Sequence, residues 1–296
     1  MRRFLAQVGA SFLVFATVLL LPTAAGADTI GPITFESSQG YVVGGIHGQP
    51  IPSTLPNGAW SKTGPYDVMV APISTYPDAA GYGFGSQALR ISNAVTSGSF
   101  GDQTFSPGLA DEAGETGADN AGLSGGLRQP HFDASFLIGT TQAELEPGLR
   151  MTVSPDRGDG ARMSFLRFED QLDGVHVIFA DATNRGPVGA ETTFTESDVA
   201  TLDRDRSHLV QFSIDFADGT AKDTVKIYVD NKLVKTGTTW EDYYRYDPEQ
   251  TPQGNEVPTV DKLLFRQSGA PSPGTVGEGF LVDRVILGSS GRMERK

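Results

Sequence analysis

The side chains best suited to ligand binding in this sequence form a dense aromatic run near position 240. The run contains Trp240, Tyr243, Tyr244 and Tyr246, interleaved with Glu241, Asp242, Arg245 and Asp247. The charged residues between the rings predict a loop. Loops held on a rigid scaffold commonly carry binding residues. The alternative interpretation is that the rings cover a sheet edge or one end of a hydrophobic core.

A second set of polar side chains follows from period-two alternation, which places neighbouring residues of a strand on opposite faces. His176 lies between Val175 and Val177, and therefore points away from their apolar face. The same rule places His131, Asp133, Lys226 and Tyr228 on polar faces. Arg167 belongs to a segment, 162–168, that is apolar on both faces, so its direction stays open. The candidates for ligand binding, beside Trp240 and Tyr243, are Tyr228, His176, His131, Arg167 and Glu169; an ordinary solvated sheet face is the alternative.

Three aspartates could hold a metal ion. Asp156, Asp159 and Asp173 stand in tight glycine-containing turns, where carboxylates and carbonyl oxygens can collect calcium. Their spacing is not that of an EF-hand loop, and the alternative is that they cap their own turns. The four histidines show no short metal-binding spacing, and we expect no required cofactor.

The start of the chain is typical of a signal peptide. Arg2 and Arg3 precede an apolar run, 8–21, and the small residues 25–27 resemble a cleavage site. We expect cleavage after Ala27, a mature chain of residues 28–296, and a secreted or periplasmic location. An uncleaved membrane anchor is the alternative; no later apolar stretch approaches the length of a membrane span.

Charge and cysteine content exclude several classes of protein. The formal net charge is −13, and it becomes −15 when Arg2 and Arg3 leave with the leader. This balance opposes nucleic acid as a partner, because phosphate neutralisation dominates such binding. The sequence has no cysteine, so neither a disulfide nor a thiolate nucleophile is available. Stability must come from one sizeable core.

Short strand patterns separated by turn residues recur through the mature chain. The clearest are Phe132–Ile138, Val210–Phe216 and Val225–Val229, and Asp230-Asn231 then predicts a tight hairpin into Lys232–Thr236. One helical turn is predicted, over Glu196–Asp203. Two long segments, 44–65 and 95–128, predict loops that carry function or lack order. The pattern predicts one all-β domain, an antiparallel β-sandwich of the jelly-roll type.

Three stretches resemble the concanavalin A-like lectin/glucanase superfamily, in its laminin-G-like form and as a bacterial secreted member. They are S-I-D-F at 213–216, V-K-I-Y-V-D-N-K-L-V-K-T-G at 225–237 and G-F-L-V-D-R-V-I-L at 279–287. Asn231 stands where that superfamily often has glycine, and Asn tolerates the same left-handed conformation. The resemblance implies carbohydrate recognition or cleavage, although a fold alone does not establish either.

Two enzyme classes are weighed against simple binding. Glycosidases of this fold resemble one another in an E-x-D-x-x-E strand motif, which is absent, and the adjacent Glu169 and Asp170 would point in opposite directions. Polysaccharide lyases place Arg, His, Gln and Tyr on a sheet face, and the polar-face residues here leave that class open. Our interpretation is a non-catalytic, lectin-like protein that binds a glycan or polysaccharide. The alternatives are a lyase or hydrolase acting on an extracellular polysaccharide, and a surface protein without a glycan ligand.

Overall fold

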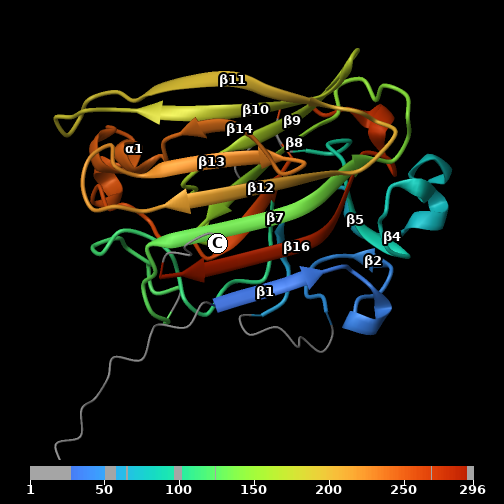
Figure 1. Cartoon of the computed structure of the whole chain (residues 1–296), viewed down its shortest axis with the longest axis horizontal. Helices are drawn as coiled ribbons and strands as arrows, with labels where there is room; N and C mark the ends of the chain where they lie inside the picture. The colour runs from blue at the N-terminus through green and yellow to red at the C-terminus, as the bar shows by residue number, and fades with distance from the viewer. Residues whose placement is uncertain are drawn as a thin grey trace, which may run out of the picture.

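The chain folds as two antiparallel β-sheets packed face to face (Figure 1). This computed structural model describes residues 28–50, 58–64, 66–96, 102–123, 125–267 and 269–291. The predicted signal peptide, 1–27, lies outside the described residues. The predicted fold class, an antiparallel β-sandwich, is confirmed.

One layer is a nine-stranded sheet. Its order is β14 (Lys232–Gly237), β13 (Thr224–Val229), β12 (His208–Asp215), β7 (His131–Thr140), β16 (Phe280–Ser290), β5 (Gln87–Ile91), β4 (Val68–Pro72) and β2 (Gly44–Gly45), with β1 (Asp28–Ile33) also paired to β16. Every pairing is antiparallel, including β12 with β7 and β16 with β7.

The other layer is a seven-stranded sheet. Its order is β11 (Thr193–Leu202), β10 (Gly174–Thr183), β9 (Leu166–Gln171), β8 (Arg150–Asp156), β15 (Lys262–Arg266), β6 (Gln103–Phe105) and β3 (Ser61–Thr63). One α-helix, α1 (Glu241–Tyr246), lies at an end of the sandwich (Figure 1). Short 3-10 helices occupy the connections at Ser37–Gln39, Ile73–Thr75, Pro77–Gly81, Thr251–Gln253 and Pro273–Thr275.

The hydrophobic core fills the space between the two sheets. Phe136 of β7 meets Phe168 of β9 and Phe265 of β15 edge-on, with ring centroids 6.1 and 5.9 Å apart. Apolar residues that alternate along the three clearest predicted strands are buried: Phe132, Phe136, Phe212, Ile214, Phe216, Val225, Ile227 and Val229. The inward face that alternation predicts is therefore confirmed for β7, β12 and β13.

The hairpin between β13 and β14 also forms as predicted. Asp230 and Asn231 have φ angles of 49° and 65°, the left-handed conformation that a two-residue hairpin turn requires. Asp230 is fixed further, because its carboxylate accepts hydrogen bonds from the Leu209 amide and from the His208 ring.

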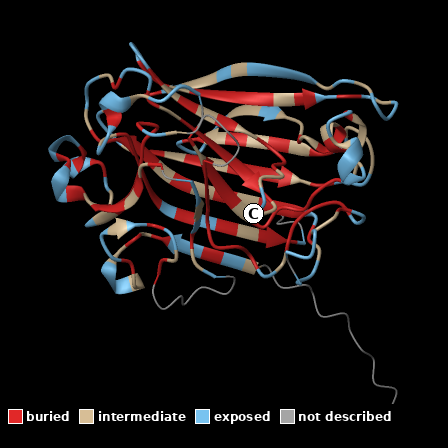
Figure 2. Cartoon of the chain, turned by 180° about the vertical axis from the view of Figure 1, so that it is seen from behind, coloured by how far each residue is buried: buried red, intermediate tan, exposed pale blue. Residues whose placement is uncertain are grey.

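Three sequence predictions of local structure are wrong. Glu196–Asp203 was expected to hold a helical turn, but 193–202 is strand β11, which is exposed along most of its length (Figure 2). The run after Trp240 was expected to be a loop, but 241–246 is α1. The segments 44–65 and 95–128 were expected to be loops, yet they contribute β2, β3 and β6. Among the described residues, no helix is long and apolar enough to cross a membrane.

Candidate functional site

A hollow of about 450 Å³ lies beside α1, and we call it the α1 hollow. Its aromatic wall consists of Phe194 from β11, Trp240 from the position before α1, and Tyr243 from α1. Arg162 and Arg266 approach it from the seven-stranded sheet side. The structure thus brings together two residues proposed from the sequence, Trp240 and Tyr243.

The α1 segment is held against the sandwich by directed hydrogen bonds. Trp240 donates its indole N–H to the carbonyl of Ala180 at 3.0 Å, and its backbone N–H to Met163 at 3.0 Å. The Tyr244 hydroxyl donates to the carbonyl of Arg162 at 3.1 Å. These bonds fix the backbone of a helix too short to be stable alone.

The aromatic wall is packed on one side and open on the other. Phe165 stacks on Trp240 with a centroid distance of 6.0 Å and an interplanar angle of 22°. Phe194 meets Trp240 and Tyr243 edge-on, at 4.9 and 5.6 Å. Trp240 packs against the main core, whereas Phe194 is 45% exposed. Phe194 is therefore the ring of this wall that a ligand can cover most fully.

The polar lining of the hollow carries both signs of charge. The Arg162 guanidinium lies 5.9 Å from the Trp240 ring centroid, within the range of a cation–π interaction. Burial lowers the pKa of Arg266, and the charge of Arg162 lowers it further. Arg157 is paired with Asp119 at 2.9 Å and with Asp159 at 2.8 Å. Glu249 and Glu256 complete the charged lining.

The Tyr243 hydroxyl is set as a hydrogen-bonding group. It donates to Glu249 at 2.9 Å and accepts from the Gln250 amide at 2.8 Å. Burial and the nearby Glu249 raise the pKa of Tyr243 to about 12, so the phenol keeps its proton at neutral pH. The hollow therefore offers aromatic faces beside fixed donors and acceptors.

Arg167, Glu169 and His176 lie on the outer face of the seven-stranded sheet, but they do not line the hollow. Glu169 accepts from Arg150 and from Arg167, each at 2.6 Å, and Arg167 also pairs with Glu196. The His176 ring bridges Asp173 and Asp198. These residues neutralise one another across neighbouring strands.

Tyr228 and His131 lie on the opposite side of the molecule, on the outer face of the nine-stranded sheet. The His131 ring bridges Asp133 and Asp215, with both nitrogen–oxygen distances 2.8 Å. Burial lowers the pKa of His131, but the hydrogen bonds and charges of the two carboxylates together outweigh it, so the pKa is raised. The residues proposed from the sequence as one site thus lie in three places: the α1 hollow, the outer face of the seven-stranded sheet and the outer face of the nine-stranded sheet.

The three aspartates proposed as metal ligands have other partners. Asp156 is buried and accepts the amides of Gly158 and Gly160 at 2.6 and 3.1 Å, as a turn-capping residue does. Asp159 is paired with Arg157, and Asp173 with His176. No position common to all three carboxylates appears in the part of the chain that the structure describes.

A different acidic cluster, invisible in the sequence, forms under α1. Glu115, Asp223 and Glu241 bring carboxylate oxygens within 4.8 Å of one another, and all three are buried. Burial raises the pKa of Asp223 to about 7, and the charge of Glu115 raises it further. Burial raises the pKa of Glu241 to about 8, and the charge of Asp223 adds to that rise. Glu241 accepts the amides of Lys222 and Asp223. The cluster therefore ties α1 to the segment before β13.

The fold places the chain among antiparallel β-sandwich proteins. Neither a family model nor a curated protein sequence matches it. Solved structures with a similar fold include an alginate lyase in complex with alginate tetrasaccharide, at 9% identity, covering 92% of this chain and 100% of that chain, with a TM-score of 0.48.

Further similar structures have lower scores. A glucuronan lyase from Trichoderma reesei shares 14% identity over 75% of this chain and 87% of its own, with a TM-score of 0.38. A carbohydrate-binding module from Bacillus subtilis shares 12% over 78% of this chain and 95% of its own, with a TM-score of 0.36. The chain also covers 17% of a sialidase. At these values the likeness concerns the β-sandwich and assigns no ligand.

Proposed function

We propose that this protein binds a glycan through the α1 hollow. The observation that carries the proposal is the meeting of Phe194, Trp240 and Tyr243 beside a rim of hydrogen-bonding side chains. A sugar ring has an apolar C–H face and a rim of hydroxyl groups. It therefore needs an aromatic surface for affinity and placed polar groups for orientation.

The charge of the rim supports a ligand rich in hydroxyl groups. Guanidinium and carboxylate groups line the same hollow, and Arg157 is already paired with two aspartates. Hydroxyl groups both donate and accept hydrogen bonds. They therefore match a rim that contains both guanidinium and carboxylate groups better than a ligand whose charges all have the same sign.

The proposal is for binding without catalysis, in a secreted or periplasmic protein related to the concanavalin A-like superfamily. The Tyr243 phenol has a raised pKa and donates its one hydrogen to Glu249, which supports a role as a fixed polar group in binding and not as a base near neutral pH. The sequence of the leader supports export.

The test is a glycan array probed with residues 28–296, once with calcium and once with a chelator. We expect selective binding that Phe194→Ala weakens and Leu172→Ala does not. Leu172 is the matched control, because it is an 88% exposed apolar side chain in the β9–β10 turn, outside the hollow. Absence of binding to every glycan would refute the proposal. Depolymerisation of a bound polysaccharide would replace it with an enzyme.

A further inference from the structure

A second hollow, of about 480 Å³, crosses the outer face of the nine-stranded sheet, and we call it the sheet trough. Strand register builds it in two rows. In one row Tyr228 stands beside Gln211, Gln211 beside Ser135, and Ser135 beside Ile286. In the other row Ser213 stands beside Asp133, Asp133 beside Gly288, and Gly288 beside Thr29. The trough thus crosses five neighbouring strands.

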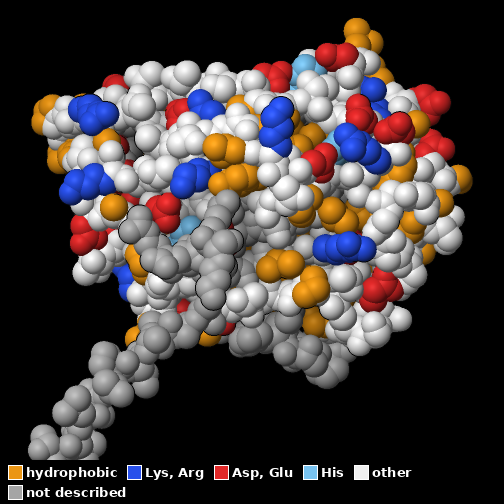
Figure 3. Space-filling view, viewed as in Figure 1, with side chains coloured by type: hydrophobic (Ala, Val, Ile, Leu, Met, Phe, Trp, Pro, Cys, Tyr) orange, Lys and Arg blue, Asp and Glu red, His pale blue; other side chains and the backbone are white. Residues whose placement is uncertain are grey.

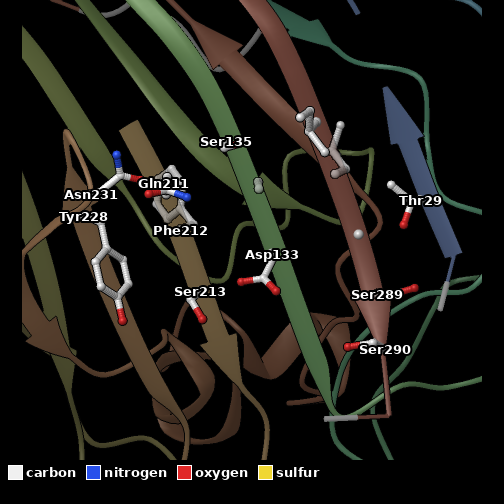
Figure 4. Close-up of a pocket in the computed structure, with 14 residues that line it drawn as sticks. Thr29, Asp133, Ser135, Gln211, Phe212, Ser213, Tyr228, Asn231, Ser289 and Ser290 are labelled. Atoms are coloured by element: carbon white, nitrogen blue, oxygen red, sulfur yellow. The ribbon is translucent and has the colours of Figure 1, made fainter. Parts of the chain in front are cut away.

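The size of the side chains gives the trough its shape. Ser135, Ser213 and Gly288 form a low floor on the central strands. Tyr228 and Asn231 lie on the β13 side, and Thr29 lies on the β1 side (Figure 4).

Figure 3 looks onto this layer and shows acidic and basic side chains interspersed over the visible surface, without one patch of a single sign.

The side chains that line the trough are almost all uncharged. Asp133 is the only acidic or basic side chain among the described residues that line the trough, and its carboxylate is engaged by the His131 ring at 2.8 Å. The other polar lining groups are serine and threonine hydroxyls, the Tyr228 phenol and two amides, Gln211 and Asn231. Hydroxyls and amides can both donate and accept hydrogen bonds.

We propose that the sheet trough is a second binding site, and that its ligand is a neutral oligosaccharide. The Tyr228 ring supplies a flat apolar surface, and Gln211 and Asn231 supply paired donors and acceptors beside it. An anionic sugar would lie near the Asp133 carboxylate and meet no basic side chain in the trough lining. The site lies on the other sheet from the α1 hollow, and it stands independently of binding there.

Gly288 offers a way to block the trough without disturbing the core. A Cβ atom there would lie 3.6 Å from the Asp28 carbonyl oxygen and 3.7 Å from the Thr29 hydroxyl, which are ordinary contact distances. The neighbouring Leu287 faces the core, so a side chain at 288 projects into the trough. Gly288→Leu should therefore occupy ligand space while leaving the fold intact.

The experiment is calorimetric titration with cellohexaose, xylohexaose and mannohexaose, and with a galacturonic acid hexasaccharide as the charged comparison. It uses the Phe194→Ala protein, so that the α1 hollow contributes little. We expect at least one neutral hexasaccharide to bind, and Tyr228→Ala and Gly288→Leu each to weaken it at least tenfold, with Leu172→Ala unchanged. We expect the acidic hexasaccharide to bind at least tenfold more weakly.

The proposal is overturned if no neutral hexasaccharide binds, or if binding survives both trough variants unchanged. It is equally overturned if the acidic hexasaccharide binds as well as the neutral ones. If the α1 hollow binds no glycan, the wild-type and Phe194→Ala proteins should have the same affinity for the hexasaccharide. That result refutes binding at the α1 hollow and leaves the trough proposal standing. Melting temperatures of the two variants check that loss of binding is not loss of fold.

Discussion

Truncation of Phe194 gives a loss of glycan affinity that can be worked out from its exposure. The residue is 45% exposed on the open side of the aromatic wall. A large aromatic side chain has roughly 200 Å² to bury, so about 90 Å² remains for a ligand to cover. At about 25 cal/mol per Å², full coverage contributes about 2.2 kcal/mol to binding.

That energy corresponds to a measurable change in affinity. Because about 1.4 kcal/mol is a factor of ten, Phe194→Ala should weaken binding by about 40-fold if the ring is fully covered. If half of its exposed surface is covered, the loss should be about sixfold. The assay is calorimetric titration with the glycan that binds most strongly on the array, beside Leu172→Ala as the control.

Binding by Phe194→Ala within twofold of the wild type, with both variants keeping the wild-type melting temperature, would refute contact between the glycan and Phe194. The ligand would then not touch the aromatic wall, and the α1 hollow would not be the site. A fall in affinity shared by Leu172→Ala would point to a general loss of fold instead.

The remaining predictions concern stability and processing. Phe212→Ala removes a fully buried ring and should cost about 3–5 kcal/mol in chemical denaturation, whereas an unchanged midpoint would contradict the core described above. Trp240→Ala should cost about 3 kcal/mol, because the indole packs on the core and donates to a strand carbonyl; a melting temperature equal to that of wild type would show that it is dispensable. Burial raises the pKa values of Glu146 and Glu241 to about 8, so the folded state holds protons that the unfolded state has released; stability should fall as pH rises from about 5 to 9, and Glu241→Gln should flatten that fall. A melting temperature that rises over this range would contradict the assignment. Intact mass of exported protein should show a chain that begins after Ala27, and retention of the leader would refute the predicted cleavage.

The strands that build the core could be read from the sequence because one face of each is buried. Phe212 and Ile227 alternate with Gln211 and Tyr228, and the structure keeps that alternation. Strand β11 could not be read in the same way. It is an edge strand exposed on much of both faces, so its residues show no apolar alternation. Thr195 or Ser197 as a cap, with Asp198 near the start, favoured a helical turn instead.

The site was only partly predictable, because alternation tells which residues face away from the core but not on which sheet. Tyr228 and His176 both point outward, yet they belong to different sheets and lie on opposite faces of the sandwich. Trp240 and Tyr243 are close in sequence, and their ring centroids lie 6.0 Å apart in the structure. Phe194 contacts Trp240 through tertiary packing, although the two residues are 46 positions apart in the sequence. No local sequence pattern predicts that contact.

The most direct test of glycan binding at the α1 hollow is an NMR titration that follows the two indole N–H signals. The chain has two tryptophans, and they occupy different environments: Trp240 lines the hollow, whereas Trp60 is 1% exposed within the core. With the glycan selected on the array, we expect the Trp240 signal to shift in proportion to saturation, together with the backbone signals of Phe194 and Tyr243, while the Trp60 signal stays fixed. Saturable binding that leaves the Trp240, Phe194 and Tyr243 signals unmoved would show that the glycan binds elsewhere than in the α1 hollow.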